Sequence, residues 1–159
     1  MSPPNTATAA QSRSPLQRPA LLGIAIPAYK RESLLARLLD SINTELPIVV
    51  SDNGGYLSDS FKARYPAVKF LSGPEVTVLK NWNRAASSLD SEWIVMPGDD
   101  NLYYPSSFPT IERTLQAHPS ADIVFFGHYI IDEHDQVRET WQPETRLLRA
   151  PHGFDAIRL

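Results

Sequence analysis

Two adjacent carboxylates, Asp99 and Asp100, follow an apolar run and a glycine, and they are the residues best suited to chemistry. Neighbouring carboxylates repel each other unless a cation lies beside them. Mg²⁺ and Mn²⁺ take oxygen ligands and often share them with substrate phosphates. The pair therefore indicates a metal site. A turn is the alternative, because Gly-Asp-Asp-Asn also suits an Asx turn that caps a following helix.

Polar side chains also follow two earlier apolar runs, at residues 21–28 and 47–51. They are Tyr29, Lys30, Arg31, Asp52 and Asn53. Asp52 is suited to accept hydrogen bonds from a ribose or a base, as acids at this position do in nucleotide-binding sheets. Equally, it suits the turn that Asn53 and Gly54 indicate, and the sequence leaves both interpretations open.

Four basic residues lie near helix starts or on the helix before the fourth strand: Lys30, Arg31, Lys80 and Arg84. A bound diphosphate would need such charges, with a metal, to neutralise it. The alternative is that they are solvated helix residues, since long cationic side chains usually keep their charge in water.

Composition and missing motifs exclude several function classes. The chain has 159 residues, no cysteine and a formal charge of -3, which argues against thiol chemistry, thiolate zinc sites and a basic nucleic-acid surface. It contains no G-x-G-x-x-G, no P-loop and no G-x-S-x-G motif, so NAD-type binding, P-loop hydrolysis and serine hydrolysis are disfavoured.

Alternating strands and helices must position these residues. Apolar runs predict strands at residues 21–28, 47–51, 68–71, 92–96 and 121–131, and helices at 31–43, 57–65, 76–89 and 106–118. The helix at 76–89 is expected to place Leu79, Trp82, Ala86 and Leu89 on its buried face, with Trp82 and Trp93 in the core. Short alternation of this kind predicts an α/β, Rossmann-like sheet, mostly parallel, with helices on both faces. The acids at 132–135 predict a polar turn into an antiparallel addition.

Residues 1–20 differ in composition from the rest, with four prolines, two arginines and no acid. We expect a disordered tail there and a folded domain at 21–159. No apolar run approaches the ~20 residues of a membrane-spanning helix, so the sequence predicts a soluble, cytoplasmic protein.

In order and spacing, four segments resemble the family 2 glycosyltransferases, an inverting group with the GT-A fold. They are residues 22–31 (LGIAIPAYKR), 49–55 (VVSDNGG), 81–86 (NWNRAA) and 92–101 (EWIVMPGDDN). The resemblance implies a GT-A type three-layer sandwich and a hexosyltransferase in polysaccharide or glycoconjugate synthesis. It implies a nucleoside diphosphate sugar as donor and a glycan or lipid-linked molecule as acceptor. No nucleic-acid partner is expected, and any association with the inner face of a membrane would be peripheral.

The resemblance also implies roles for individual residues. Pro27, Ala28 and Tyr29 would border the base, Asp52 would bind the base or ribose, and Asn83 would shape the nucleotide pocket. Asp99 and Asp100 resemble the family's DxD-type motif, with Asp100 preferred as the ligand of Mg²⁺ or Mn²⁺. Arg31, Asn53 and Lys80 complete the expected substrate-binding set.

The sequence departs from the family pattern at Lys30, where Asn is usual, at Gly55, where Ser or Thr is usual, and in the motif Gly-Asp-Asp-Asn. Residues 21–105 would form the nucleotide-sugar-binding half, and 106–159 a shortened, incomplete acceptor half. The general base is therefore left unassigned among Asp132, Glu133, Asp135 and Asp155, of which the first three fit a solvated turn.

Two other functions compete with this one. One is a catalytically inactive remnant that binds a nucleotide sugar or a protein partner. The other is a sugar-phosphate nucleotidyltransferase, which the lack of a glycine-rich loop after the first strand disfavours.

Overall fold

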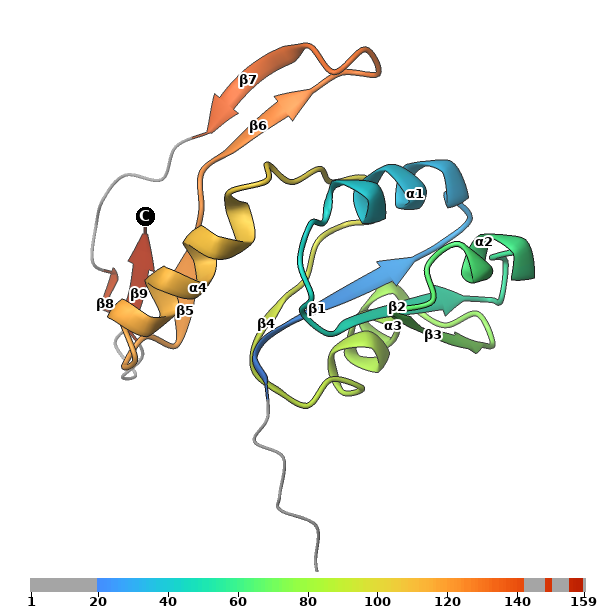
Figure 1. Ribbon diagram of the computed structural model, residues 1–159, viewed down its shortest axis with the longest axis horizontal. Coiled ribbons are helices and arrows are strands. Elements are labelled where there is room, and N and C mark those ends of the chain that lie inside the picture. The colour runs from blue at the N-terminus through green and yellow to red at the C-terminus, as the bar shows by residue number, and fades with distance from the viewer. Residues whose placement is uncertain (1–19, 142–147, 150–154, 159) are drawn as a thin grey trace, which may run out of the picture. The chain divides into compact units, whose positions relative to one another are not determined.

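The computed structural model describes residues 20–141, 148–149 and 155–158 (Figure 1). The tail expected at 1–20 lies outside the described residues except for Ala20, which begins the first strand. The chain divides into two compact units, Met1–Arg37 with Glu45–Asn101, and Leu38–Thr44 with Leu102–Leu159. The predicted boundary between residues 105 and 106 stays a prediction.

A four-stranded parallel sheet forms the centre of the first unit. Its strands are β1 (Ala20–Ala28), β2 (Ile48–Asn53), β3 (Val68–Gly73) and β4 (Ser91–Val95), in the order β3-β2-β1-β4. β1 is central and reads as a continuous apolar run, because a parallel strand covered on both faces has no solvent side. Accordingly, Leu22, Ile24 and Ile26 are fully buried.

Helices cover both faces of this sheet. α1 (Glu32–Ser41) and α2 (Asp59–Ala63) connect β1 to β2 and β2 to β3, whereas α3 (Val78–Ala86) returns the chain to the far side of β1. Right-handed crossovers place connections of opposite direction on opposite faces, and Figure 1 shows α1 and α2 above the sheet and α3 below it. The fold is therefore the expected α/β, Rossmann-like GT-A type sandwich.

The strand order reverses between β1 and β4, since β2 and β3 extend the sheet on one side of β1 and β4 on the other. Open α/β sheets bind ligands at such a switch point, beyond the carboxyl ends of the strands. The register brings the ends of β1, β2 and β3 level, with Ala28 beside Asp52 and Asp52 beside Ser72, while Val95 at the end of β4 lies beside Ile24 of β1. Residues that follow β1, β2 and β4 thus share one edge.

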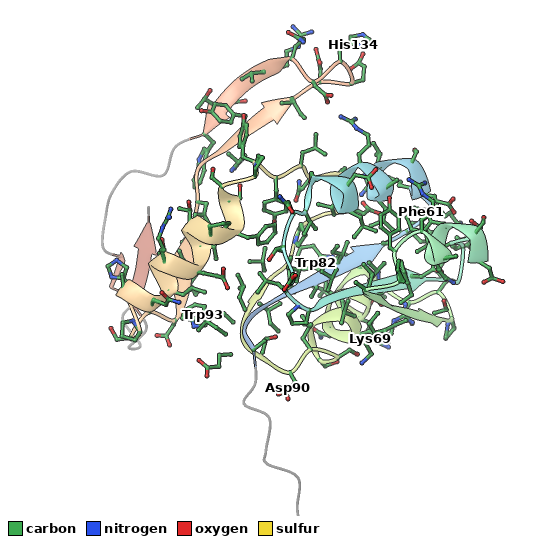
Figure 2. The ribbon with its side chains drawn as sticks, in the orientation of Figure 1. Phe61, Lys69, Trp82, Asp90, Trp93 and His134 are labelled. Atoms are coloured by element: carbon green, nitrogen blue, oxygen red, sulfur yellow. The ribbon has the colours of Figure 1, made fainter. Side chains whose placement is uncertain are left out.

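The predicted buried face of α3 is wrong at Leu79 and Trp82, whereas Ala86 and Leu89 are half-buried. Leu79 is 73% exposed and Trp82 37% exposed, whereas the buried residues of the helix are Asn81 and Ala85. Trp82 (labelled in Figure 2) is therefore not a core residue. The reason is a polar network beneath the helix: Ser51 donates to Asn81 Oδ1 at 2.7 Å, and Asn81 Nδ2 donates to the carbonyl of Ala28 at 3.5 Å.

Arg84 completes this network and is not the solvated residue that its type suggested. Its Nε donates to Ser51 Oγ at 2.6 Å, and its Nη2 donates to Asn81 Oδ1 at 2.9 Å and to the carbonyl of Asp52 at 3.3 Å. Gly73 leaves room for the guanidinium, because a Cβ there would lie 2.4 Å from Nη1 of Arg84. α3 is thus fixed to β1 and β2 by polar as well as apolar contacts.

In its described residues, the second unit contains α4 (Ser107–Ala117) and five short strands. β5 (Ile123–Phe125) pairs with β9 (Asp155–Arg158), which pairs with β8 (Leu148–Arg149), and β6 (His128–Ile131) forms an antiparallel hairpin with β7 (Val137–Trp141). The single strand expected at 121–131 is therefore wrong: it breaks at Phe126 and Gly127, as a glycine inside a strand often indicates. Among the described residues, no helix is long and apolar enough to span a membrane.

Candidate active site

A pocket of about 630 Å³ lies at the carboxyl edge of the sheet, within the first unit. This volume is in the range of small-molecule and cofactor sites. Residues that follow β1, β2 and β4 line it together with the segment leading into α3. They are Pro27, Tyr29, Lys30, Arg31, Asn53, Glu75, Val76, Thr77, Val78, Asn81, Trp82 and Asp99.

Arg31 bridges the two carboxylates that the sequence singled out. Its Nη1 donates to Asp100 Oδ2 at 2.7 Å, and its Nη2 donates to Asp99 Oδ1. Asp99 is 1% exposed and also accepts the backbone N–H of Tyr29 at 3.1 Å. The ion pair thus spans the switch point and fixes the end of β1 to the loop after β4.

Burial and charge act in opposite directions on Arg31. Partial burial lowers the pKa of the guanidinium, but the charges of Asp99 and then Asp100 outweigh burial and raise it. Arg31 therefore stays cationic, and it is the cation that adjacent carboxylates require.

These carboxylates fit a divalent cation only in part. Among the described residues no group of three or more His, Cys, Asp or Glu gathers as a metal site. Mg²⁺, however, is commonly held by one or two carboxylates while substrate phosphates and water supply the rest. The Asp100 side chain is 46% exposed, and Arg31 is its one hydrogen-bond partner in the described part of the chain. The donor set therefore suits a cation that arrives with a phosphate ligand.

Two tyrosines and a glutamate form a second cluster at the pocket. The hydroxyls of Tyr29 and Tyr56 donate to Glu75 at 2.8 Å and 3.0 Å, and the two rings meet edge to face at 5.7 Å. The Lys30 ammonium lies 4.6 Å and 4.5 Å from the ring centroids and 3.9 Å from Glu75. Hydrogen bonds from Tyr29 and then Tyr56 lower the pKa of the Glu75 carboxyl. The cluster thus keeps one positive and one negative charge at the pocket.

Lys30 adopts a left-handed backbone conformation, with a φ of 56°. Such a conformation costs roughly 1–2 kcal/mol for a residue with a side chain. It turns the chain sharply between Tyr29 and Arg31, so that the two residues reach different partners, Glu75 and the acid pair.

Asn53 holds the segment that leads into α3. Its side-chain oxygen accepts the N–H of Val76 at 2.8 Å, and its Nδ2 donates to the carbonyl of Val76 at 3.0 Å. The amide therefore pairs with the backbone as a neighbouring strand would, and it places Val76 in the pocket wall.

Asp52 has the turn-forming role that the sequence left as an alternative. It is 1% exposed, its carboxylate accepts the N–H groups of Tyr56 at 2.9 Å and Leu57 at 3.1 Å, and Lys62 Nζ lies 3.5 Å away. With both oxygens engaged, Asp52 is not among the residues that line the pocket.

The structure brings together only part of the expected substrate-binding set. Pro27, Tyr29, Arg31, Asn53 and Asp99 line the pocket. Ala28 is buried behind it and contributes its carbonyl to Asn81. The expected residues outside the lining are Asp52, Lys80, Asn83 and Asp100, and both Lys80 and Asn83 are exposed on α3.

Sequence reasoning missed the contribution of the segment at residues 75–78 and of two residues on α3. Asn81 is the asparagine of α3 that reaches the pocket, and Trp82 lines it with its exposed ring. No signal in the sequence could have found Asn81, because the burial of Ala85, one helical turn further along the same face, is seen only in the structure.

In the second unit, the acids at 132–135 form the expected hairpin turn. Asp132 accepts the N–H groups of His134 and Gln136, each at 2.9 Å, and the hydrogen bond from Gln136 is the main cause that lowers the pKa of Asp132. Figure 2 shows His134 at the tip of this hairpin. Asp155 is the first residue of β9. The general base remains unassigned.

The model of the family described as Glycosyl transferase family 2 matches residues 23–157. No curated protein matches the chain.

Proposed function

The chain belongs to glycosyl transferase family 2 and carries a glycosyltransferase domain; we propose that it moves a hexose from a nucleoside diphosphate sugar to an acceptor hydroxyl. The pocket at the switch point carries this proposal, because it joins an aromatic wall, two basic side chains and a carboxylate pair at one edge of the sheet. Donor binding needs these three features: stacking for the base, cations for the diphosphate and acids for the ribose or a metal.

The base would lie against the aromatic side of the pocket. Tyr29 and Trp82 are half exposed there, with Pro27 beside them. Large aromatic rings that stay exposed in a pocket provide stacking surface, and stacking is tolerant of base identity. Asn81 also lines the pocket and is held by hydrogen bonds from Ser51 and Arg84, so its position is set before a ligand arrives.

The diphosphate would lie near Lys30 and Arg31. With Glu75, Asp99 and Asp100, these residues give the edge two positive and three negative side chains, a net charge of -1. An anionic diphosphate is not attracted to such an edge unless a divalent cation accompanies it. Mg²⁺ or Mn²⁺ held by Asp100 and Asp99 would neutralise charge on the leaving diphosphate. Arg31 and Lys30 would supply further positive charge to the diphosphate.

Binding of nucleoside diphosphates tests the donor site. Calorimetry with uridine, guanosine and thymidine diphosphates, with and without Mg²⁺, is expected to give metal-dependent binding of at least one of them. Trp82→Ala should weaken that binding by about tenfold, since one aromatic stack contributes about 1–3 kcal/mol. Leu79→Ala is the matched control, because Leu79 is an exposed apolar residue on the same helix outside the pocket. Equal losses in both variants would refute the assignment of the pocket.

Transfer needs a separate assay, since the pocket belongs to one unit and would bind a donor whether or not the chain is active. Chromatography that measures the release of nucleoside diphosphate from the sugar nucleotide distinguishes the enzyme from an inactive sugar-nucleotide-binding protein. Tight binding with no release, in water or with glycan and lipid-linked acceptors, would favour the inactive protein. The acceptor class and the two functional halves stay predictions from the resemblance, and the cytoplasmic location stays a prediction from the composition of the sequence.

A further inference from the structure

Arg31 engages one oxygen of each of the two carboxylates to which a divalent cation would bind. Its guanidinium donates through Nη2 to Asp99 and through Nη1 to Asp100, so each carboxylate already has a charge-assisted hydrogen bond. Asp99 also accepts the Tyr29 N–H and is held in place by it. A cation that approaches the free protein therefore meets a pair of acids that is already partly neutralised.

Arg31 is also placed to leave this position. Its side chain is half exposed and lines the pocket in which a diphosphate would lie. A planar guanidinium binds phosphate in the same two-pronged geometry as it binds carboxylate. Moving from the acid pair to a phosphate therefore exchanges one set of charge-assisted hydrogen bonds for another.

We infer that Arg31 is a positioning residue that couples the cation to the donor: it excludes a free divalent cation from Asp99 and Asp100, and it transfers to the diphosphate when the two enter together. Only the second part of this inference, the transfer of Arg31 to the diphosphate, rests on the proposed function. In the first state Arg31 neutralises one of the two acidic charges. In the second state the cation takes the acid pair, and Arg31 adds positive charge to the donor.

Electron paramagnetic resonance, which measures the binding of Mn²⁺ alone, tests without any nucleotide whether Arg31 excludes the cation. Arg31→Met should bind Mn²⁺ at least about tenfold more tightly than the wild-type chain, because two unit charges about 4 Å apart repel by about 1 kcal/mol even in bulk water, and a divalent ion doubles this. Lys69→Met is the control, because it removes one positive charge from an exposed side chain whose hydrogen bond is to the carbonyl of Ser88. A loss of structure would not produce a gain of affinity.

Wild-type protein provides a measurement that needs no variant. NMR signals of the Arg31 guanidinium should stay unchanged when Mg²⁺ alone is added, and they should shift when Mg²⁺ and a nucleoside diphosphate are added together. Displacement by Mg²⁺ alone, or Mn²⁺ affinity in Arg31→Met no higher than in wild type, would overturn the inference. Failure of every nucleoside diphosphate to bind would overturn the proposed function, while the Mn²⁺ comparison would still decide whether Arg31 excludes the cation.

Discussion

Arg84 offers a direct test of the polar network beneath α3. Arg84→Met keeps most of the aliphatic stem and removes the guanidinium, which donates to Ser51, Asn81 and the carbonyl of Asp52. Ser51 is completely buried, and its hydroxyl retains Asn81 as a partner in the variant. The Asp52 carbonyl loses its side-chain donor, and the hydroxyl of Ser51 loses the group that it accepts from.

The magnitude follows from these contacts. Hydrogen bonds to charged groups contribute about 1.5–3 kcal/mol each, and a buried group left without a partner costs about 1–3 kcal/mol. Arg84 is itself half-buried, so water replaces some of the lost hydrogen bonds. The total loss of free energy should therefore lie near the low end of these ranges. We expect Arg84→Met to lower the free energy of unfolding by about 2–3 kcal/mol, and the melting temperature by about 10 °C.

Urea and thermal unfolding, followed by circular dichroism, measure the change, with Lys69→Met as the control. That control should stay within about 0.5 kcal/mol of wild type, as exposed substitutions usually do. A double-mutant cycle with Ser51→Ala should give a coupling of about 1 kcal/mol or more, because the two side chains share a bond. A cost for Arg84→Met no larger than that of the control, or a coupling of zero, would refute the network as a source of stability.

Three further comparisons use the loops around the pocket. Gly54→Ala should lower the free energy of unfolding by about 2 kcal/mol or more, and Gly55→Ala by about 1 kcal/mol. Both glycines have positive φ, but only a Cβ at Gly54 would meet a tyrosine ring, at 2.3 Å. Equal losses in urea unfolding would contradict this. Ser58→Ala should cost about 1 kcal/mol and Thr77→Ala only a few tenths, since Ser58 accepts the N–H that caps α2 whereas Thr77 makes no side-chain cap at α3; the reverse order would refute the assignment of the caps. Glu75 has a folded pKa below its ordinary value of 4.5, so its contribution to stability is present above that pH and is lost as the pH falls through the folded pKa. Glu75→Gln should therefore reduce the dependence of the melting temperature on pH below about 4.5, and an unchanged slope would show that the tyrosine bonds do not matter.

The sheet was predictable because its strands carry their own signal. The run that forms β1 is apolar at nearly every position, which only a strand buried on both faces requires. Asn53, Gly54 and Gly55 likewise indicated the end of β2 before any partner was known. The edge where Tyr29, Arg31 and Asp99 gather then followed from the rule on strand ends.

The contacts of α3 were not predictable from its own residues. Periodicity selected Trp82 and Leu79 for the core because they are apolar, yet the sheet-facing residue is Asn81. Its partners Ser51 and Ala28 lie 30 and 53 positions away in the sequence, and no local pattern indicates that a polar group will find them. The same holds for Asp52, whose turn-forming and ligand-binding interpretations differ only in where its carboxylate points.

The amide of Asn53 has a consequence for how this protein ages. Asn followed by Gly is the pair most prone to deamidate, because the glycine nitrogen attacks the side-chain carbonyl to form a cyclic imide. Here both polar atoms of the Asn53 side chain are bonded to Val76, and the N–H of Gly54 donates to the carbonyl of Gly73 at 3.0 Å. The folded chain keeps the attacking and attacked groups engaged elsewhere, so isoaspartate at residue 53 should accumulate only in molecules in which this edge of the sheet has opened.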